Sequence, residues 1–114
     1  MHELGIVFHM IQSVERVGAE NGLSSVSSVT LELGEVSGVV PQELRDCWDW
    51  AVKRTELLPH SELRIEMLPA VTYCADCGRE YPTVRYGRIC PHCGSEKTWL
   101  TRGSEINIKE IEAL

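Results

Sequence analysis

Two segments of this chain repeat apolar residues at the spacing of an amphipathic helix. Over residues 3–21 an apolar side chain recurs every three or four positions, and Asn21-Gly22 is a natural stop. A second segment begins at Pro41, which suits the first position of a helix, and should end before Pro59. The predicted apolar stripes consist of Leu4, Val7, Phe8, Ile11, Val14 and Val17 in the first helix, and of Leu44, Cys47, Trp48, Ala51, Val52 and Thr55 in the second.

Three other segments alternate apolar and polar residues, which is the pattern of a half-buried strand. The first covers residues 27–35, and the second follows Pro59. Their apolar positions are Val29, Leu31, Leu33, Leu63, Ile65 and Met67. The third begins at Ile106, and its alternation breaks at Glu110, so a bulge or the end of the strand is expected near Lys109.

The order of these elements predicts an α+β fold: helix, strand, helix, strand, a cysteine-bearing segment, strand. The simplest assembly is a small three-stranded sheet with two helices on one face. The cysteine-bearing segment, residues 70–103, is then an inserted domain between the last two strands, with Pro69 and Gly103 at its boundaries. Residues 1–69 together with 104–114 form the other predicted domain.

The composition suits a soluble globular protein. Of the 114 residues, 43% are hydrophobic and 25% are charged, and a chain of this length commonly forms one compact unit with room for a small appendage. No apolar run approaches the ~20 residues that a membrane span needs, and the amino terminus lacks the basic segment of a secretion signal. We therefore expect a cytoplasmic protein, in a compartment where thiols stay reduced and paired cysteines usually bind metal.

The net charge of −6 is unevenly distributed. Residues 1–69 carry 5 basic and 11 acidic side chains, whereas residues 70–103 carry 5 basic and 3 acidic ones and are the only mildly basic part. A general nucleic-acid binder would show a denser basic surface. The charge balance favours protein partners or metal cations over nucleic acid or a membrane.

Four of the five cysteines form two pairs, Cys74-x-x-Cys77 and Cys90-x-x-Cys93, separated by 12 residues. This spacing fits four thiolates around one tetrahedral Zn²⁺, and a glycine follows each pair, where a positive φ lets the loop close. A site closed by four thiolates keeps no position for water, so we expect structural rather than catalytic zinc. Residues 70–103 are therefore predicted to form a zinc-ribbon-like domain with a four-cysteine metal site.

Other candidate ligands have simpler explanations. Cys47 lies on the predicted apolar stripe and is expected in the core, as are Trp48 and Trp50. His9 is expected to be exposed without a metal role, and the His92 side chain is expected to point away from the zinc ion. No nucleophile–base pair is recognisable, so we do not predict an enzyme.

The first residues can chelate a second metal. The Met1 α-amine, the His2 backbone nitrogen and the His2 imidazole Nδ1 can form fused five- and six-membered chelate rings, and Glu3 adds an amide and a carboxylate. Deprotonating an amide nitrogen requires a strongly polarising ion that prefers planar coordination, which among biological divalent ions means Ni²⁺ or Cu²⁺.

Several motifs occur together in this chain. They are the opening Met1-His2-Glu3-Leu4, the strand and turn Leu31-Glu32-Leu33-Gly34-Glu35-Val36-Ser37, and the pairs Cys74-x-x-Cys77 and Cys90-Pro91-x-Cys93. In this order they closely resemble the HypA/HybF family of hydrogenase nickel-incorporation proteins, over essentially the whole chain. The resemblance implies a metallochaperone that delivers Ni²⁺ to the precursor of a [NiFe]-hydrogenase large subunit together with the GTPase HypB. Some members of that family also serve urease maturation, and a homodimer is compatible with this interpretation.

The resemblance also assigns residues. His2 matches the nickel-ligand histidine of the family and Glu3 matches its neighbour in the same site, beside the Met1 amine, while the four paired cysteines match the zinc ligands. This chain differs from some relatives in the segment 38–41, Gly-Val-Val-Pro, where they place a carboxylate that can approach the nickel. The first acid here is Glu43, so the fourth planar position is left to the Glu3 amide, water or another group.

A zinc-ribbon module that binds nucleic acid is the alternative function. Such a module would place basic side chains on phosphates and stack aromatic rings on bases. The candidates are Arg79, Arg85, Arg88, Lys97 and Arg102 for phosphates, and Tyr81, Tyr86 or Trp99 for stacking. The net charge of −6 argues against this alternative.

Overall fold

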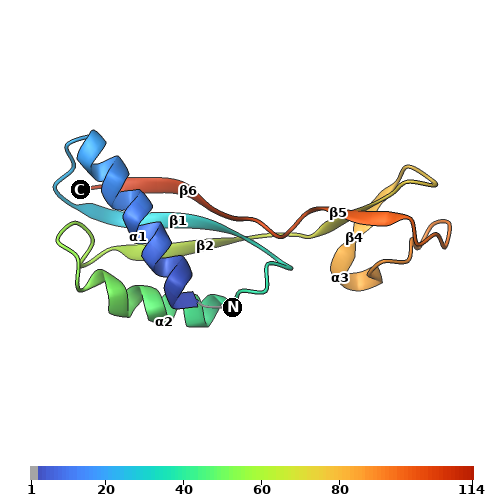
Figure 1. The fold of residues 1–114 in the computed structure, drawn as a ribbon, viewed down its shortest axis with the longest axis horizontal. Coiled ribbons are helices and arrows are strands. Elements are labelled where there is room, and N and C mark those ends of the chain that lie inside the picture. The colour runs from blue at the N-terminus through green and yellow to red at the C-terminus, as the bar shows by residue number, and fades with distance from the viewer. Residues whose placement is uncertain (1–2) are drawn as a thin grey trace. The chain divides into compact units, whose positions relative to one another are not determined.

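The computed structural model describes residues 3–114, and it contains both predicted helices and all three predicted strands (Figure 1). No helix in this described range is both long and apolar enough to cross a membrane. The elements are α1 (Glu3–Glu20), β1 (Val26–Gly34), α2 (Pro41–Val52), β2 (Glu62–Leu68), β3 (Val71–Cys74), β4 (Glu80–Pro82), α3 (Thr83–Tyr86), β5 (Thr98–Arg102) and β6 (Ile106–Ala113).

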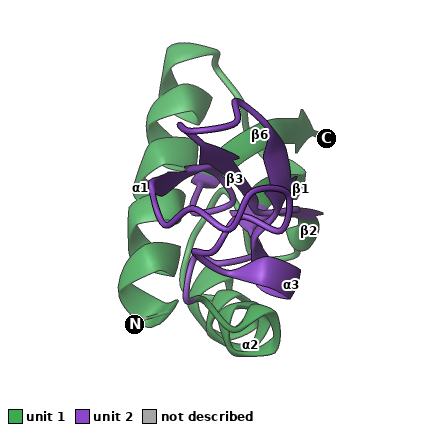
Figure 2. Ribbon diagram, turned by 90° about the vertical axis from the view of Figure 1, so that its right-hand side faces the viewer, with its two compact units in different colours: residues 1–32, 39–66, 107–114 green, residues 33–38, 67–106 purple. Residues whose placement is uncertain are grey.

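The chain divides into two compact units, coloured separately in Figure 2. The first unit comprises residues 1–32, 39–66 and 107–114, and the second comprises residues 33–38 and 67–106. The second unit is thus larger than the cysteine-bearing segment alone, because the end of β1 and the turn after it belong to it.

The first unit contains the predicted three-stranded sheet, in the order β2-β1-β6. Helices α1 and α2 pack against each other and contribute the apolar side chains that the sheet buries. Its most deeply buried large residues are Val7, Val14, Val26, Val29, Leu31, Leu44, Trp48 and Leu58. The α+β class and the three-stranded sheet are confirmed.

The apolar stripes are narrower than predicted. Leu4 and Phe8 are 38% and 45% exposed, and Trp50 is 48% exposed, with the Arg54 guanidinium 3.6 Å from the centre of its indole ring. The buried line along α1 instead includes Met10, so the helix has turned Leu4 and Phe8 to the edge of its contact. Our expectation that Trp50 lies in the core was wrong.

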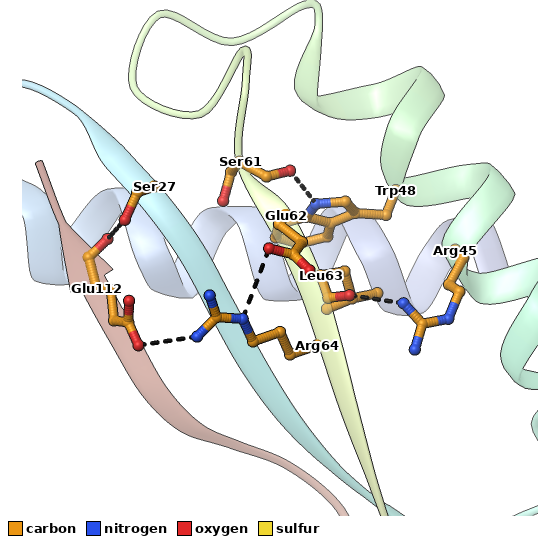
Figure 3. Close-up of polar contacts among 8 residues, drawn as sticks. All are labelled: Ser27, Arg45, Trp48, Ser61, Glu62, Leu63, Arg64 and Glu112. Carbon is orange, nitrogen blue, oxygen red and sulfur yellow. Dashed lines mark hydrogen bonds and ion pairs between the residues drawn. The ribbon is translucent and has the colours of Figure 1, made fainter.

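The central strand β1 is buried on both faces, although its alternation predicted only one. Ser28 and Thr30 are 2% and 5% exposed. Because β1 lies between β2 and β6, side chains that pair from one outer strand to the other pass across it (Figure 3). These pairs are Arg64 with Glu112 at 3.0 Å and Lys109 with Glu66 at 2.8 Å.

Strand β6 continues to Ala113, so our alternative that it ends near Lys109 was wrong. Lys109 and Glu110 are both exposed, whereas exposed and half-buried residues alternate before them and Ile111 is half-buried after them. The alternation therefore shifts by one residue at this point, which agrees with the bulge alternative.

The second unit contains a three-stranded sheet in the order β4-β3-β5, with both pairings antiparallel. This sheet and the single turn α3 were not predicted, because segments of three to five residues are too short to show a clear period.

Three segments of the second unit cross where side chains have no room. A Cβ on Gly34 would clash with the Gly103 carbonyl, and a Cβ on Gly103 would clash with Ala70. The crossing is held by backbone and carboxylate contacts: the Val36 N–H donates to Gly103 O at 2.8 Å, and Glu35 Oε1 accepts the Ala70 N–H at 2.9 Å.

Candidate metal centre

The four paired cysteines converge at one point. Their sulfur atoms all lie within 4.8 Å of one another, and the Cys74–Cys93 and Cys77–Cys90 sulfurs are each 3.6 Å apart. A tetrahedral ion with Zn–S bonds of about 2.3 Å requires sulfurs about 3.8 Å apart, whereas a disulfide requires about 2.05 Å. The residues present therefore fit a tetrahedral metal ion, and all four thiols are free.

Each cysteine pair lies in a loop of the same construction, residues 74–79 and residues 90–95. In each loop the first cysteine amide donates to the carbonyl of the sixth residue, and the amide of the fifth residue, a glycine, donates back to the first cysteine. The bonds are Cys74 to Arg79 (2.9 Å), Gly78 to Cys74 (2.9 Å), Cys90 to Ser95 (3.0 Å) and Gly94 to Cys90 (2.8 Å). The two glycines have φ of 72° and 74°, as their sequence positions predicted.

The two ligands of each pair differ in exposure. Cys74 and Cys90 are buried, and with Tyr81 they form a buried cluster of the second unit. Cys77 and Cys93 face solvent. The metal centre therefore has one buried side, which forms part of the interior of this unit, and one exposed side.

The thiols strongly affect one another's ionisation. Burial acts to raise the pKa of Cys90, but the backbone N–H groups of His92 and Cys93, together with neighbouring thiols, lower it to about 7. The Ser95 backbone N–H acts to lower the pKa of Cys93, but burial and the thiols of Cys74 and Cys90 outweigh it and raise this pKa to about 12. Thiols this close cannot all ionise without a cation among them, so the cluster is suited to a divalent ion.

The amino-terminal site is described only from Glu3 onward, and the predicted ligands Met1 and His2 lie outside the described residues. Glu3 is 8% exposed, and its Oε2 accepts the backbone N–H of Val40 at 3.3 Å. This contact joins the start of α1 to the residue before α2. Glu43, the first acid after the Gly-Val-Val-Pro segment, is exposed on α2.

The other candidate residues lie mostly where the sequence indicated. His9 and His92 are exposed, and Cys47 is half-buried on α2 rather than in the core as we expected. His92 Nδ1 lies 3.5 Å from Arg79 Nη1.

Two of the aromatic residues named for the nucleic-acid alternative pack within the second unit. Tyr81 is buried and its hydroxyl donates to Gly87 O at 2.9 Å. Trp99 packs on Tyr73, with ring centres 5.1 Å apart. Tyr81 is therefore not available to stack on the bases of single-stranded nucleic acid, whereas Trp99 stays 54% exposed beside Tyr73.

Sequence reasoning missed two side-chain contacts between the cysteine loops. Ser95 Oγ donates to Asp76 Oδ2, and Arg79 approaches His92. The signal that could have indicated them is the equal length of the loops, because the two contacts join corresponding positions.

Comparison with known proteins shows that the sequence matches a known family. Residues 1–113 match the family described as "Hydrogenase/urease nickel incorporation, metallochaperone, hypA". The chain is 38% identical over 112 residues to hydrogenase maturation factor HypA 1 of Bradyrhizobium diazoefficiens and 32% identical over 112 residues to hydrogenase maturation factor HybF of Klebsiella pneumoniae, with 98% of each chain covered in both cases.

The fold has solved counterparts as well. It is similar to the solution structure of the Ni metallochaperone HypA from Helicobacter pylori, with a TM-score of 0.75, 22% identity, and coverage of 100% of this chain and 98% of that chain. At this identity the likeness concerns the fold alone, whereas the family match spans the sequence from residue 1 to residue 113. This chain belongs to the HypA family of nickel-incorporation metallochaperones.

Proposed function

We propose that this protein binds Ni²⁺ at its amino terminus and delivers it during maturation of a [NiFe]-hydrogenase. The observation that carries the proposal is the family match over residues 1–113, which includes the Met1-His2-Glu3 opening. In this proposal the Met1 amine and the His2 amide and imidazole nitrogens bind the ion, and the fourth planar position falls to the Glu3 amide, water or another group, in keeping with the planar preference of Ni²⁺.

The four-cysteine centre has a different task in this proposal: it holds zinc permanently. Cys74, Cys77, Cys90 and Cys93 would occupy all four positions of a tetrahedral ion, and none remains for water or substrate. The bound zinc supplies folding energy rather than chemistry. The protein therefore acts as a carrier without catalytic turnover.

The partners follow from the delivery role. We infer that the nickel donor or regulator is a HypB-type GTPase and that the recipient is the precursor of a hydrogenase large subunit, with urease maturation proteins as further candidate partners. The exchange takes place in the cytoplasm. The net charge of −6 supports protein and metal partners rather than nucleic acid.

Nickel titration of the zinc-loaded protein with an untagged amino terminus tests the site. We expect a planar-nickel absorption band that disappears in His2→Ala and in a variant extended before Met1. His9→Ala is the matched control, because it removes an exposed histidine of α1 and should leave the band unchanged. Unchanged nickel affinity in His2→Ala would show that the site is wrongly assigned.

The contact between Glu3 and Val40 allows a finer test. Because the Glu3 carboxylate already accepts the Val40 N–H, we propose that it holds the residue before α2 and does not itself bind nickel. Glu3→Gln keeps an acceptor oxygen and should retain nickel affinity, whereas Glu3→Ala should weaken it by loosening the residues around the site. A loss of affinity in Glu3→Gln equal to that in Glu3→Ala would instead indicate a carboxylate ligand.

Delivery itself is tested in cells that lack their own chaperone of this family. The wild-type protein should restore hydrogenase activity at low nickel, and His2→Ala should not. Excess nickel should restore activity in both cases, because mass action replaces delivery. Restoration by His2→Ala at low nickel would contradict the delivery role.

A further inference from the structure

The two cysteine loops are joined by side chains at corresponding positions. Asp76 is the third residue of loop 74–79 and accepts a hydrogen bond from Ser95, the sixth residue of loop 90–95. In the opposite direction, His92 is the third residue of the second loop and contacts Arg79, the sixth residue of the first. Each loop therefore places its third side chain against the sixth of the other.

The cysteine contacts are reciprocal between the loops in the same way. The two short sulfur–sulfur distances, 3.6 Å each, join the first cysteine of one loop to the second cysteine of the other. Loops of equal construction therefore face each other in an approximately two-fold arrangement, with the candidate metal between them. Each of the two side-chain contacts joins one loop to the other within three residues of a cysteine in both loops.

The two side-chain contacts differ in strength. Ser95 Oγ donates to Asp76 and also accepts the Lys97 backbone N–H at 3.0 Å, so its hydroxyl is held on both sides. The Ala75 N–H donates to Lys97 O at 2.9 Å and ties the same region to the first loop. The Arg79–His92 contact spans 3.5 Å between nitrogens, at the outer limit of a hydrogen bond.

The Asp76–Ser95 bridge also lies next to the accessible ligands. Asp76 directly precedes Cys77, and Ser95 follows Cys93 by two residues. These are the two exposed cysteines, where water, protons or a competing chelator first reach the metal centre. When one exposed thiolate detaches, a bridge between the loops keeps it close to the ion, and recapture competes with loss of the metal.

We propose that the Asp76–Ser95 hydrogen bond locks the two cysteine loops together and slows the loss of zinc. This rests on the zinc assignment in the proposed function. The lock keeps zinc resident in a protein whose task is to handle another metal, and it makes Asp76 and Ser95 positioning residues for the cysteine ligands.

Electrostatic repulsion alone predicts the opposite effect of the Asp76 carboxylate on zinc release. Four thiolates on Zn²⁺ give the centre a net charge of −2, and the Asp76 carboxylate adds a further negative charge nearby. If electrostatic repulsion dominated, removing the carboxylate would retain zinc more firmly. If the hydrogen bond dominates, as we propose, removing the carboxylate speeds zinc release.

Zinc transfer from the full-length, zinc-loaded protein to the chromogenic chelator 4-(2-pyridylazo)resorcinol measures this. Asp76→Ala should release zinc about 3–10-fold faster, the range expected for losing one hydrogen bond. Ser95→Ala should release zinc at least as fast, because it also removes the acceptor of the Lys97 N–H. The double variant should release zinc no faster than Ser95→Ala, because in this proposal Asp76 acts only through Ser95. Asp76→Asn keeps an acceptor oxygen without the charge and should remain within about two-fold of wild type.

Glu96→Ala is the matched control. Glu96 is an exposed acid beside Ser95, and among the described residues its carboxylate makes no hydrogen bond or ion pair, so its removal should leave the rate unchanged. Arg79→Ala should change the rate by less than about two-fold, because its contact with His92 is long. Wild-type or slower release from Asp76→Ala, or additive effects in the double variant, would overturn the lock.

Metal analysis of the purified proteins separates the lock from the zinc assignment. One zinc per chain in every variant, with equal release rates, would overturn the lock and leave the zinc site standing. A wild-type protein that binds no zinc would overturn both. Zinc content of one per chain also shows that a variant is folded at its metal centre before its rate is compared.

Discussion

Each of the two units has a different kind of interior. The first unit buries large aliphatic and aromatic side chains from two helices and three strands, among them Leu31, Leu44 and Trp48. The buried cluster of the second unit consists of Cys74, Tyr81 and Cys90, and two of these three are candidate metal ligands. The second unit therefore has a candidate metal centre in the place where the first unit has an apolar core.

The small size of the second unit explains why an apolar core alone is not expected to stabilise it. A segment of about 40 residues buries too little apolar surface to offset the conformational entropy of folding, and a bound metal commonly makes up the deficit. The second unit also leaves large apolar side chains outside: Val84, Ile89 and Trp99 are all more than half exposed.

Metal removal should have the largest effect, and it should affect the second unit and not the first. Chelating zinc, or replacing Cys74 by Ser, should abolish amide protection over residues 70–103 and leave the first unit protected in hydrogen exchange. The reason is that structural zinc contributes about 10–16 kcal/mol of binding energy in small zinc-dependent domains.

Cys47→Ser is the matched control for that experiment, because it removes the one thiol outside the four-cysteine cluster. It should leave both zinc content and the protection of residues 70–103 unchanged. If the second unit kept its amide protection after complete zinc removal, its folding would not depend on metal, and the proposed difference between the two units would be wrong.

Loss of a core tryptophan should test the first unit in the same way. Trp48 is fully buried and its indole N–H donates to Ser61 O at 3.0 Å, so Trp48→Ala should lower the free energy of unfolding of the first unit by about 3–5 kcal/mol. Trp50→Ala, on the exposed side of the same helix, should cost at most about 1 kcal/mol through its contact with Arg54.

Denaturant unfolding of both tryptophan variants, with zinc content measured alongside, checks this prediction. Zinc content should stay at the wild-type level in each under native conditions. Loss of zinc from Trp48→Ala while it remains folded would mean that the metal centre depends on the core of the first unit. The two units would then not be stabilised independently.

A glycine at the strand crossing should have the next largest effect, this time on the second unit. Gly103 has φ of 115° and an added Cβ would meet Ala70, so Gly103→Ala combines backbone strain with a clash, at about 2–4 kcal/mol. Gly87, with φ of 65°, ψ of −133° and open space around it, supplies the control: Gly87→Ala should carry the backbone strain alone, about 1–3 kcal/mol, without a clash.

Hydrogen exchange of the second unit at saturating zinc compares these two glycine variants. Equal destabilisation by both would show that the segments at the crossing move apart at little cost in free energy. The effect of each variant would then come from backbone strain alone. A Gly103→Ala protein with wild-type protection would show that the crossing is not a rigid feature of the second unit.

The first unit was largely predictable because its elements are long enough to show a period. The alternation at Val29, Leu31 and Leu33 indicated the central strand, and all three residues are buried. Periodicity does not give the width of a contact, however, and so Leu4 and Phe8 were wrongly placed on the buried side of the first helix.

The second unit was predictable in its chemistry and not in its fold. The spacing of the cysteines indicated one centre because tetrahedral coordination demands four sulfurs in two close pairs. Strands of three to five residues gave no comparable signal. The contact of Glu3 with Val40 was equally hidden, since it joins residues 37 positions apart through a backbone N–H that has no signature in the sequence.

The smallest expected effect concerns the ion pairs across the sheet of the first unit, which should add little to a core-dominated unit. The hydrogen bond to Glu66 raises the pKa of Lys109 above its ordinary value of about 10.4, aided by the charge of Glu66 and by the Glu32 and Glu110 carboxylates. The folded state thus holds this proton more tightly than the unfolded state. The stabilisation is fully present below the unfolded pKa and is lost as pH rises through the folded pKa.

The difference in unfolding free energy between wild type and Lys109→Gln should therefore be small at pH 8 and should decline as the pH rises past the ordinary lysine pKa of about 10.4. The corresponding difference for Arg64→Gln should persist over the same range, because the Arg64 guanidinium, 3.0 Å from Glu112, stays protonated. Denaturant unfolding of the three proteins between about pH 8 and about pH 11.5 distinguishes the two pairs. If the Lys109 difference were large, or if it did not decline as the pH rises, surface charge would be contributing to the first unit in a way that its apolar core does not explain.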